Sequence, residues 1–460
     1  MDGSSLSRGV LRFTERLRNE DVNLYGFLLS VSGKQIAGAY CPPFREGQPH
    51  RLYSVSKTFT GIAVGMLAED GLLSLDQPVA GFFRDWLPED PSPFLLRLTL
   101  RDMLRMATCY RRTAYREGTD VNWAKAFFTG SPDHEPGTVF AYDTGCSQVL
   151  AALVKRVSGR EVIDFLEKRL FTPLGCTDPR KWLRDPSGCC QGGTGLCMSL
   201  RDLHRVAECL LRGGDGLVPR WYAEEMGKKQ ISTALQEKEE ERYGYGWQCW
   251  CTRAGWAMYG MGGQLSVICP EHRAVLSTVA DTRLDPYGVQ RIYDAFFEEI
   301  LPLLPEGGVF PENTDGLPLT PALRFAGLKD NPAAVFPGSR RYRFDAGNPL
   351  RLDSLVLSAA ELRFVRNGTE EVLPWARGQT LEAAWPGHPE VPALVSSGWI
   401  EEGLLRIRCH AIGDSPCGFD MLLCLREDCV TIRSRCSSDP LTAAYDGFAS
   451  GTPVKGGQDP

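Results

Sequence analysis

Tyr53-Ser54-Val55-Ser56-Lys57-Thr58-Phe59-Thr60-Gly61 places a serine hydroxyl and a lysine amine three residues apart, at the expected start of a helix. Residues at i and i+3 share a helix face, so Ser54 and Lys57 should point into the same space. A serine becomes a nucleophile when a base beside it removes its proton, and a lysine whose pKa is lowered can be that base. The spacing alone is a weak signal, because an N-cap serine followed by a solvated lysine would give the same pattern.

Composition narrows the classes of protein that this chain can be. Its 460 residues exceed what one core normally supports, so we expect two domains. Hydrophobic content of 43% and charged content of 23% are those of an ordinary soluble globular protein. The net charge of −6 argues against nucleic acid as a partner, since binding phosphates needs a basic face.

Targeting and cysteine patterns point to the cytoplasm. The start of the chain lacks the basic and apolar segments of a signal peptide, and no apolar run approaches the ~20 residues of a membrane span. None of the 16 cysteines forms a Cys-x-x-Cys motif. We therefore expect buried free thiols in a reducing compartment, and we expect no metal and no cofactor. The sequence leaves the oligomeric state open.

Hydrophobic periodicity predicts an α+β catalytic domain over residues 1–305, with one antiparallel sheet closed by its N- and C-terminal segments. The expected helices cover residues 6–20, 54–68, 98–106, 145–158, 161–170, 200–212 and 290–304. The expected strands cover residues 24–31, 35–40, 243–252, 256–259, 264–269 and 274–278.

A second domain is predicted after a proline-rich linker at residues 306–320. Short strand patterns then dominate residues 321–450, which we expect to form a β-barrel or β-sandwich. They are clearest at residues 341–344, 362–366, 404–410, 419–425 and 429–433. Residues 451–460 are expected to be a disordered tail.

A third catalytic group is needed to carry the proton to the leaving group, and a tyrosine beside a lysine can do this. The best candidate is Tyr142, which follows a Pro136-Gly137 turn and precedes a helix. The glycine-rich segment Tyr259-Gly260-Met261-Gly262-Gly263 could let the backbone approach a ligand closely and donate to an oxyanion. A packing tyrosine and a plain β-bulge are the respective alternatives.

These motifs together resemble the serine β-lactamase-like and penicillin-binding-protein-like hydrolases. That family includes class C β-lactamases, low-molecular-weight penicillin-binding proteins, family VIII esterases and D-aminopeptidases. The resemblance covers about residues 20–305 and includes several motifs in the family's order. The matching segments are Ser54–Gly61, Gly71–Val79, Leu98–Met106, Pro136–Tyr142, Phe171–Gly175 and Gly192–Leu211.

The resemblance implies a β-lactamase/transpeptidase-like fold and a role for each matched residue. Ser54 would be the acylated nucleophile, Lys57 its base and Tyr142 the proton relay. The family's third motif, usually Lys-Thr-Gly or His-x-Gly, matches Met258-Tyr259-Gly260 and puts the second oxyanion N–H near Met261. Thr144, Tyr259, Gly260, Met261 and Gly262 are the expected substrate-binding and oxyanion residues.

Two departures from the family pattern bear on the substrate. Thr144 replaces the asparagine that usually ends the tyrosine motif, although it could simply cap the following helix. The third motif also lacks its cation, which in antibiotic-handling relatives helps to bind a substrate carboxylate and to tune the tyrosine. The resemblance therefore favours a small ester, amide or peptide without that carboxylate, and weak β-lactamase activity.

The sequence favours a serine hydrolase that works through an acyl-enzyme, with no nucleic-acid or membrane partner. A second hypothesis is a penicillin-binding-like sensor that is acylated without efficient turnover. A third is that the C-terminal domain supplies the biological function by docking a partner or shielding the cleft. No Gly-x-Ser-x-Gly motif is present, which argues against an α/β-hydrolase triad.

Overall fold

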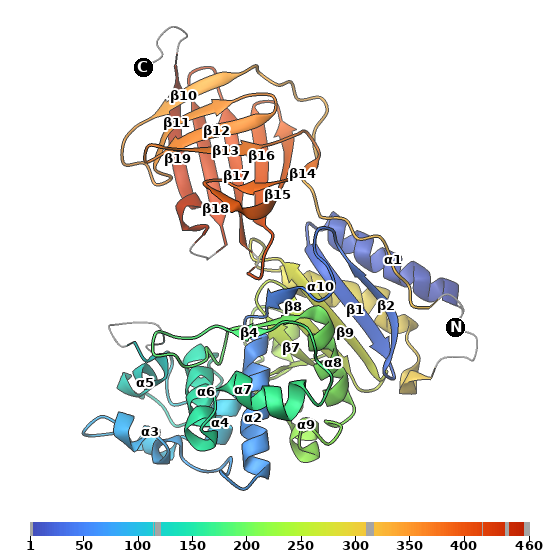
Figure 1. Ribbon diagram of the computed structural model, residues 1–460, viewed down its shortest axis with the longest axis vertical. Coiled ribbons are helices and arrows are strands. Elements are labelled where there is room, and N and C mark those ends of the chain that lie inside the picture. Colours follow the sequence, from blue (N-terminus) through green and yellow to red (C-terminus); the bar gives the residue numbers. More distant parts are fainter. Residues whose placement is uncertain are drawn as a thin grey trace. The chain divides into compact units, whose positions relative to one another are not determined.

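The computed structural model describes residues 3–113, 115, 121–309, 317–415, 417–437 and 441–454. The chain divides into two compact units (Figure 1). The first contains Leu24–Ala280 with the flanking segments Met1–Leu17 and Tyr287–Leu323. The second contains Arg324–Pro460, together with Arg18–Asn23 and Asp281–Pro286. The mixed helix-and-sheet plan and the separate all-β unit predicted from the sequence are both confirmed.

A six-stranded sheet forms the centre of the first unit, in the order β2-β1-β9-β8-β7-β6. The strands are β1 (Asn23–Val31), β2 (Lys34–Tyr40), β6 (Trp250–Thr252), β7 (Gly255–Gly260), β8 (Gln264–Cys269) and β9 (Ala274–Asp281). The N-terminal hairpin thus pairs with the last strand of the unit, as the sequence predicts. Residues 243–249, expected to be part of a strand, instead form turns and isolated bridges that lead into β6.

The two faces of this sheet carry different side chains because residues alternate along each strand. Phe27 of β1 packs edge-on against Phe13 of α1 (Gly3–Asn19), with ring centroids 5.5 Å apart. Ser30 of the same strand instead contacts His204 of α8 (Leu200–Leu211), with 3.0 Å between Ser30 Oγ and His204 Nε2. Helices α1 and α8 therefore cover opposite faces (Figure 1). Arg12 of α1 forms an ion pair with Glu299 of α10 (Gly288–Glu299), which joins these two helices.

Helix α2 (Val55–Glu69) is the central helix of the first unit. Every residue from Val55 to Leu67 is buried, so this part of the helix has no solvent-exposed face. Its glycines allow close packing: a Cβ at Gly65 would lie only 2.4 Å from the ring of Tyr222 in α9 (Arg220–Met226). The small-residue run that follows Lys57 in the sequence is the surface that permits this contact.

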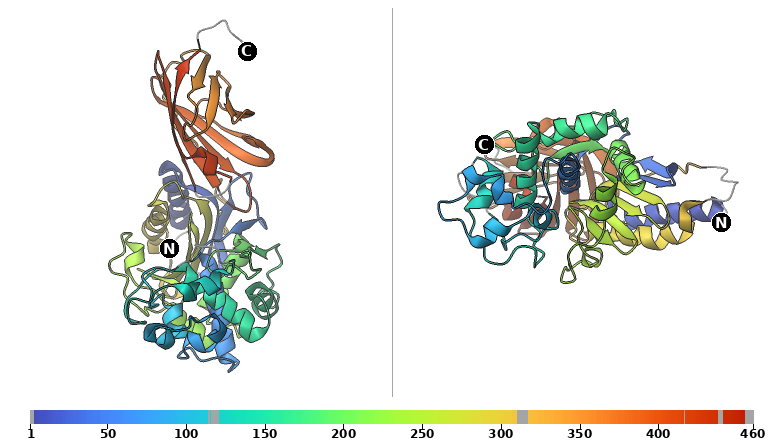
Figure 2. Two further views of the ribbon diagram at one scale, coloured as in Figure 1. Left: turned by 90° about the vertical axis from the view of Figure 1, so that its left-hand side faces the viewer. Right: turned by 90° about the horizontal axis from the view of Figure 1, so that it is seen from below.

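The other helices surround α2 on the side away from α1 (Figure 2, right). They are α3 (Pro93–Arg97), α4 (Leu100–Leu104), α5 (Trp123–Ala126), α6 (Thr144–Ser158) and α7 (Val162–Leu166). Thr99 caps α4 through a reciprocal capping box with Asp102, as its sequence predicts. The helix expected to end at residue 170 changes to a π-helix at Glu167–Phe171. A small sheet, β3 (Pro49–Arg51), β5 (Leu196–Ser199) and β4 (Lys181–Trp182), completes the unit.

The second unit is a ten-stranded antiparallel sheet that curves back on itself around one hydrophobic core (Figure 2, left). Its order is β13-β12-β11-β10-β19-β18-β17-β16-β15-β14. The strands are β10 (Arg340–Phe344), β11 (Leu352–Leu357), β12 (Glu361–Arg366), β13 (Thr369–Pro374), β14 (Thr380–Trp385), β15 (His388–Glu401), β16 (Leu404–Ala411), β17 (Cys417–Leu425), β18 (Val430–Cys436) and β19 (Gly447–Pro453).

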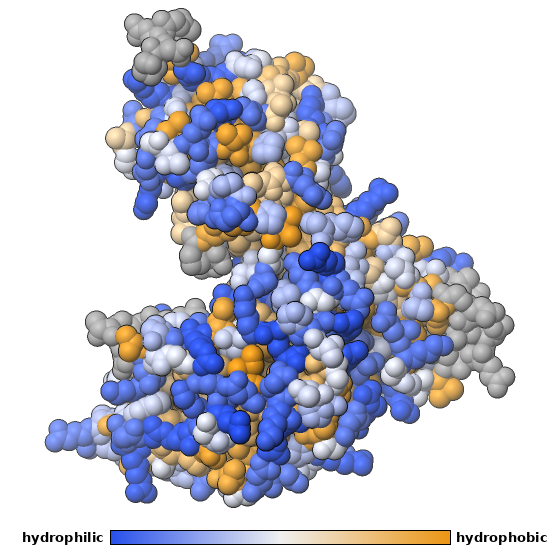
Figure 3. All heavy atoms as spheres, in the orientation of Figure 1, coloured by the Kyte–Doolittle hydropathy of each residue, from blue (hydrophilic) through white to orange (hydrophobic). Residues whose placement is uncertain are grey.

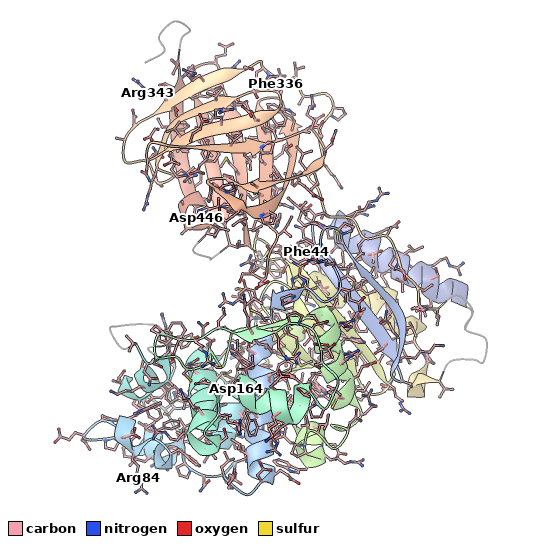
Figure 4. All side chains as sticks on the ribbon, viewed as in Figure 1. Phe44, Arg84, Asp164, Phe336, Arg343 and Asp446 are labelled. Atoms are coloured by element: carbon pink, nitrogen blue, oxygen red, sulfur yellow. The ribbon has the colours of Figure 1, made fainter. Side chains whose placement is uncertain are left out.

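Alternation again sorts the side chains of this unit. In β10, Tyr342 is buried in the core, whereas its neighbour Arg343 is exposed at the surface (Figure 4).

Strands β11, β13, β14, β15 and β19 were not expected from the sequence. Residues 451–453, expected in the tail, belong to β19, and residues 455–460 lie outside the described residues.

Part of the expected linker is structured. Residues 310–316 lie outside the described residues, but Leu319 pairs with Ala37 of β2 in parallel. The Leu319 N–H donates to the Ile36 carbonyl, and the Gly38 N–H donates to the Leu319 carbonyl. This pairing covers a sheet edge that would otherwise be open.

The surface and the cysteines fit the composition. On the face seen in Figure 3, hydrophilic and hydrophobic side chains are interspersed over the first unit. All 16 cysteines are free thiols and most are buried, as predicted. Among the described residues, no helix has both the length and the apolar character to cross a membrane.

Candidate active site

Ser54 and Lys57 meet at the N-terminus of α2. The Nζ of Lys57 donates hydrogen bonds to the Oγ of Ser54 and to the carbonyl oxygen of Gly193, each at 2.9 Å. Ser54 precedes the first helical residue, but its side chain makes no capping hydrogen bond. The preceding residue, Tyr53, has a φ of +47°, a conformation that is costly for a residue with a side chain and is common at functional sites. The local backbone therefore turns Ser54 toward Lys57 instead of toward the helix end.

Gly193 was not among the expected site residues. A Cβ at this position would lie 2.6 Å from Thr144 Cγ2 and 3.3 Å from Lys57 Nζ, so glycine is needed for the loop to pass beneath the lysine. The contact also places Thr144 close to Lys57. The sequence shows the glycine pair Gly192-Gly193, but nothing in it indicates that the Gly193 carbonyl accepts a hydrogen bond from Lys57.

Tyr142 also lies beside Ser54 and Lys57. Lys57 Nζ lies 4.9 Å from the centroid of its ring, and its hydroxyl is a hydrogen-bond partner of Ser54. The residue is 41% exposed, yet its hydroxyl end is desolvated. That desolvation raises the pKa of Tyr142 above its ordinary value, although the hydrogen bond to Ser54 opposes the rise. The structure thus brings together the three residues expected to be catalytic.

Asp143, between Tyr142 and Thr144, caps helix α6. Its Oδ1 accepts hydrogen bonds from the Gly145 N–H and from Thr113 Oγ1, both at 2.8 Å. Burial raises the pKa of this carboxyl group, partly offset by these hydrogen bonds and by Lys57. Thr144 is the first residue of the helix, so the alternative that Thr144 is its cap is wrong.

The third motif lies at the end of β7, against the chain that leads into Ser54. A Cβ on Gly260 would be 2.1 Å from the carbonyl oxygen of Leu52, so only glycine fits there. Met258, at the expected position of the family's cation, is fully buried. Met261 and Gly262 lie in the turn between β7 and β8, and Met261 is 45% exposed.

A cation approaches the third motif from another segment. Lys238 Nζ donates to the hydroxyl of Tyr259 at 3.3 Å and forms an ion pair with Glu241 at 3.1 Å. Desolvation, followed by the charge of Glu241, raises the pKa of Tyr259. Sequence reasoning missed Lys238, because no motif links it to Tyr259, which lies 21 residues further along the chain.

Gln248 joins the elements that carry the site and was also missed. Its Oε1 accepts from Ser147 Oγ at 2.6 Å, and its Nε2 donates to the carbonyls of Met103 and Leu104, both at 3.1 Å. Its own carbonyl accepts from Thr58 Oγ1 at 2.7 Å. Helices α2, α4 and α6 are thus held together by one buried amide, whose backbone φ is +59°. An isolated glutamine in a sequence gives no signal of such a role.

The described residues lack a cluster of possible metal ligands. Within the part of the chain that the structure describes, no group of three or more His, Cys, Asp or Glu side chains is arranged to hold an ion.

Curated relatives share parts of this chain. It is 31% identical over 165 residues to lovastatin esterase of Penicillium rubens, a match covering 29% of this chain and 41% of the relative. It is 26% identical over 216 residues to 6-aminohexanoate-dimer hydrolase of Paenarthrobacter ureafaciens, covering 43% of this chain and 54% of the relative. The chain thus spans about half the length of these relatives.

Solved structures share the fold. D-amino acid amidase from Ochrobactrum anthropi SV3 matches with a TM-score of 0.51 at 17% identity, over 65% of this chain and 99% of the amidase. EstCE1, a hydrolase with promiscuous acyltransferase activity, matches with a TM-score of 0.52 at 16% identity, over 64% of this chain and 99% of that chain. At these identities the likeness concerns the fold alone.

The model of the family described as Beta-lactamase matches residues 22–295, more than half of the chain. The match includes Ser54, Lys57, Tyr142 and the third motif. The expected fold is confirmed, and the chain belongs to the beta-lactamase family of hydrolases, which has esterase and amidase members.

Proposed function

We propose that the protein is a serine hydrolase that cleaves a small ester, amide or peptide bond through an acyl-enzyme at Ser54. One observation carries the proposal: Lys57 Nζ lies 2.9 Å from Ser54 Oγ at the start of a buried helix. This is the hydrogen-bond geometry that a nucleophile and its base require. Burial of Lys57, which is 1% exposed, disfavours the charged form of an amine and so suits a base.

In the proposed reaction, neutral Lys57 takes the proton of Ser54 while Oγ attacks the acyl carbon. The N–H groups of Ser54 and Met261 stabilise the oxyanion. Gly260, which has no side chain, lets the backbone at Met261 approach the substrate. Tyr142 gives a proton to the leaving group as its bond to the acyl carbon breaks, and it recovers one from the Lys57 ammonium. Water then attacks the ester at Ser54, its proton passes to Lys57, and Ser54 is protonated as the acid departs.

The proposed substrate lacks the carboxylate anchor of β-lactams. Buried Met258 stands at the third-motif cation position, and Lys238 is already engaged by Tyr259 and Glu241. The names of the matched relatives, an esterase, an amide-dimer hydrolase and an amidase, agree with an ester or amide substrate. Thr144, Tyr259 and Gly262 complete the proposed substrate-binding surface.

A fluorophosphonate probe tests the proposal directly. We expect the wild-type protein to gain one probe adduct, mapped by mass spectrometry to the peptide containing Ser54, and to hydrolyse p-nitrophenyl esters over many turnovers. Ser54→Ala should lose both properties. Ser158→Ala is the matched control, since the hydrogen bonds of Ser158 Oγ are local to the end of α6, where it contacts the Val154 and Arg160 carbonyls and accepts from the Arg160 N–H. Unlabelled wild type, or equal labelling of Ser54→Ala, would refute the mechanism. A stable adduct without turnover would favour the sensor hypothesis.

A further inference from the structure

The ring of Tyr142 is packed against two other aromatic rings. Trp250 of β6 stacks on it with centroids 5.6 Å apart and ring planes inclined by 25°. Tyr245 meets it edge-on at 6.2 Å and 86°. Lys57 Nζ lies over the same ring at 4.9 Å. Tyr142 is therefore fixed by packing, although part of it is exposed to solvent.

The two supporting rings are themselves immobilised. Trp250 is 6% exposed and pairs with Ala257 of β7 in the sheet, and Tyr245 and Trp250 form an isolated bridge. Their rings cross at 5.0 Å and 89°. Phe140 fills the remaining side, 5.2 Å from Tyr245 and 5.6 Å from Trp250. Aromatic pairs in such geometries each add about 0.5–1.5 kcal/mol beyond the burial of their area.

The charges around the Tyr142 hydroxyl do not favour a phenolate. The Nζ of Lys57 in α2 faces its ring and is uncharged in the proposed resting enzyme, and buried Met258 of β7 stands at the expected position of the family's third-motif cation. The other titratable groups that act on it are Tyr259 of β7, Cys146 of α6 and Glu241, and each raises its pKa. Tyr245 behind it is buried, and its own pKa is raised well above the ordinary value by desolvation.

We infer that Trp250 is a positioning residue that holds Tyr142 as an uncharged phenol, hydrogen-bonded to Ser54. Tyr142 gives its hydroxyl proton to the leaving group only as that group departs, and it takes a proton back from the Lys57 ammonium, so no phenolate exists in the resting enzyme. The inference rests on the proposed acyl-enzyme function, because a relay matters only if Ser54 is acylated.

Kinetics of tryptophan variants test the positioning role. Trp250→Leu should lower kcat for a small alkyl ester, whose alkoxide leaving group needs the proton from Tyr142, about 10- to 100-fold, as expected when a catalytic group is misplaced, with KM changed less than about twofold. Trp250→Phe, which keeps a stacking ring, should recover most of the loss. Trp256→Leu is the matched control, because Trp256 is also 6% exposed, lies in the neighbouring strand and packs on Gly227. It should lower thermal stability about as much as Trp250→Leu while retaining kcat.

A spectroscopic titration tests the protonation state without any turnover. The absorbance of tyrosinate near 295 nm is recorded from pH 6 to 10 for the wild type and for Tyr142→Phe. The difference between the two should show no tyrosinate over this range. A Tyr142-dependent tyrosinate near neutral pH would overturn the inference, as would equal kcat losses in Trp250→Leu and Trp256→Leu, or failure of Trp250→Phe to recover activity. Failure of the acyl-enzyme proposal would appear separately, as absence of probe labelling at Ser54.

Discussion

The Nζ of Lys57 lies 2.9 Å from the Oγ of Ser54, and Gly193 supplies a second acceptor at the same distance. The amine is thus held between the nucleophile and a fixed carbonyl, with Tyr142 beside it. Both acceptors direct the Nζ to one position, so the side chain cannot rotate away from Ser54 without losing hydrogen bonds. Because Lys57 is held in this one position, replacing it tests its contribution to the acylation of Ser54.

Replacing Lys57 by methionine should lower the rate of acylation by about 10²- to 10⁴-fold, because a general base is removed while the buried volume is kept. The measurement is stopped-flow acylation by a p-nitrophenyl ester, with circular dichroism to verify folding. Lys155→Met is the control, since Lys155 pairs with Glu161 at the surface and is absent from the site. An acylation rate within threefold of wild type in folded Lys57→Met would exclude Lys57 as the base.

The wild-type protein should hydrolyse nitrocefin at least about 10-fold less efficiently, by kcat/KM, than p-nitrophenyl butyrate. The expected position of the family's third-motif cation holds Met258, which is buried and uncharged, so a β-lactam carboxylate would lose that partner; a hydrogen bond to a charged group is worth about 1.5–3 kcal/mol. The measurement is kcat/KM for both substrates from steady-state kinetics at one pH and ionic strength. Comparable efficiencies for the two substrates would show that another group, with Lys238 the first to examine, anchors the carboxylate.

Gly260→Ala should reduce both stability and kcat, because its Cβ would lie 2.1 Å from the Leu52 carbonyl oxygen. Either the β7–β8 turn or the segment before Ser54 must shift, and a displacement of about 1 Å at a catalytic site can cost 10²-fold in rate. Gly81→Ala is the control, since a Cβ at Gly81 meets nothing within 4 Å. Thermal unfolding and ester hydrolysis are measured for both variants. If Gly260→Ala behaves like Gly81→Ala, Gly260 does not define the site.

The sequence predicted those parts of the molecule whose causes are local. The Ser54–Lys57 pair follows from helical spacing, Thr99 from capping chemistry, and β8 from its strand-like alternation, and each is found where it was expected. Gln248 and Gly193 could not be found in this way, because their partners are 101 to 190 residues away and are set by how α2, α4 and α6 pack. The second unit was recognised as all-β but half its strands were missed. Strand β15, for example, has an irregular burial pattern, with five successive exposed or half-exposed residues before its buried stretch.

A buried histidine beneath the central sheet should make the protein sensitive to acid. His204 of α8 contacts Ser277 Oγ through Nδ1 at 2.8 Å and Ser30 Oγ through Nε2 at 3.0 Å, and Ser277 also contacts Ser266 at 2.8 Å. Desolvation lowers the pKa of His204 from 6.5 to about 3. This histidine therefore stays neutral in the folded protein at pH values where it is protonated in the unfolded chain.

Above pH 6.5, His204 is neutral in both states and imposes no penalty. Between pH 6.5 and about pH 3 the unfolded chain binds a proton that the folded protein does not, so the free energy of unfolding falls as the pH falls. The slope from this one residue is at most about 1.4 kcal/mol per pH unit.

His204→Gln, which can still hydrogen-bond to the serines, should show a shallower decline in urea-unfolding free energy from pH 7 to pH 4, whatever its offset at pH 7. His388→Gln, at an exposed site in the second unit, should keep the wild-type slope. Parallel curves for His204→Gln and wild type would show that His204 accepts a proton in the folded protein as readily as in the unfolded chain.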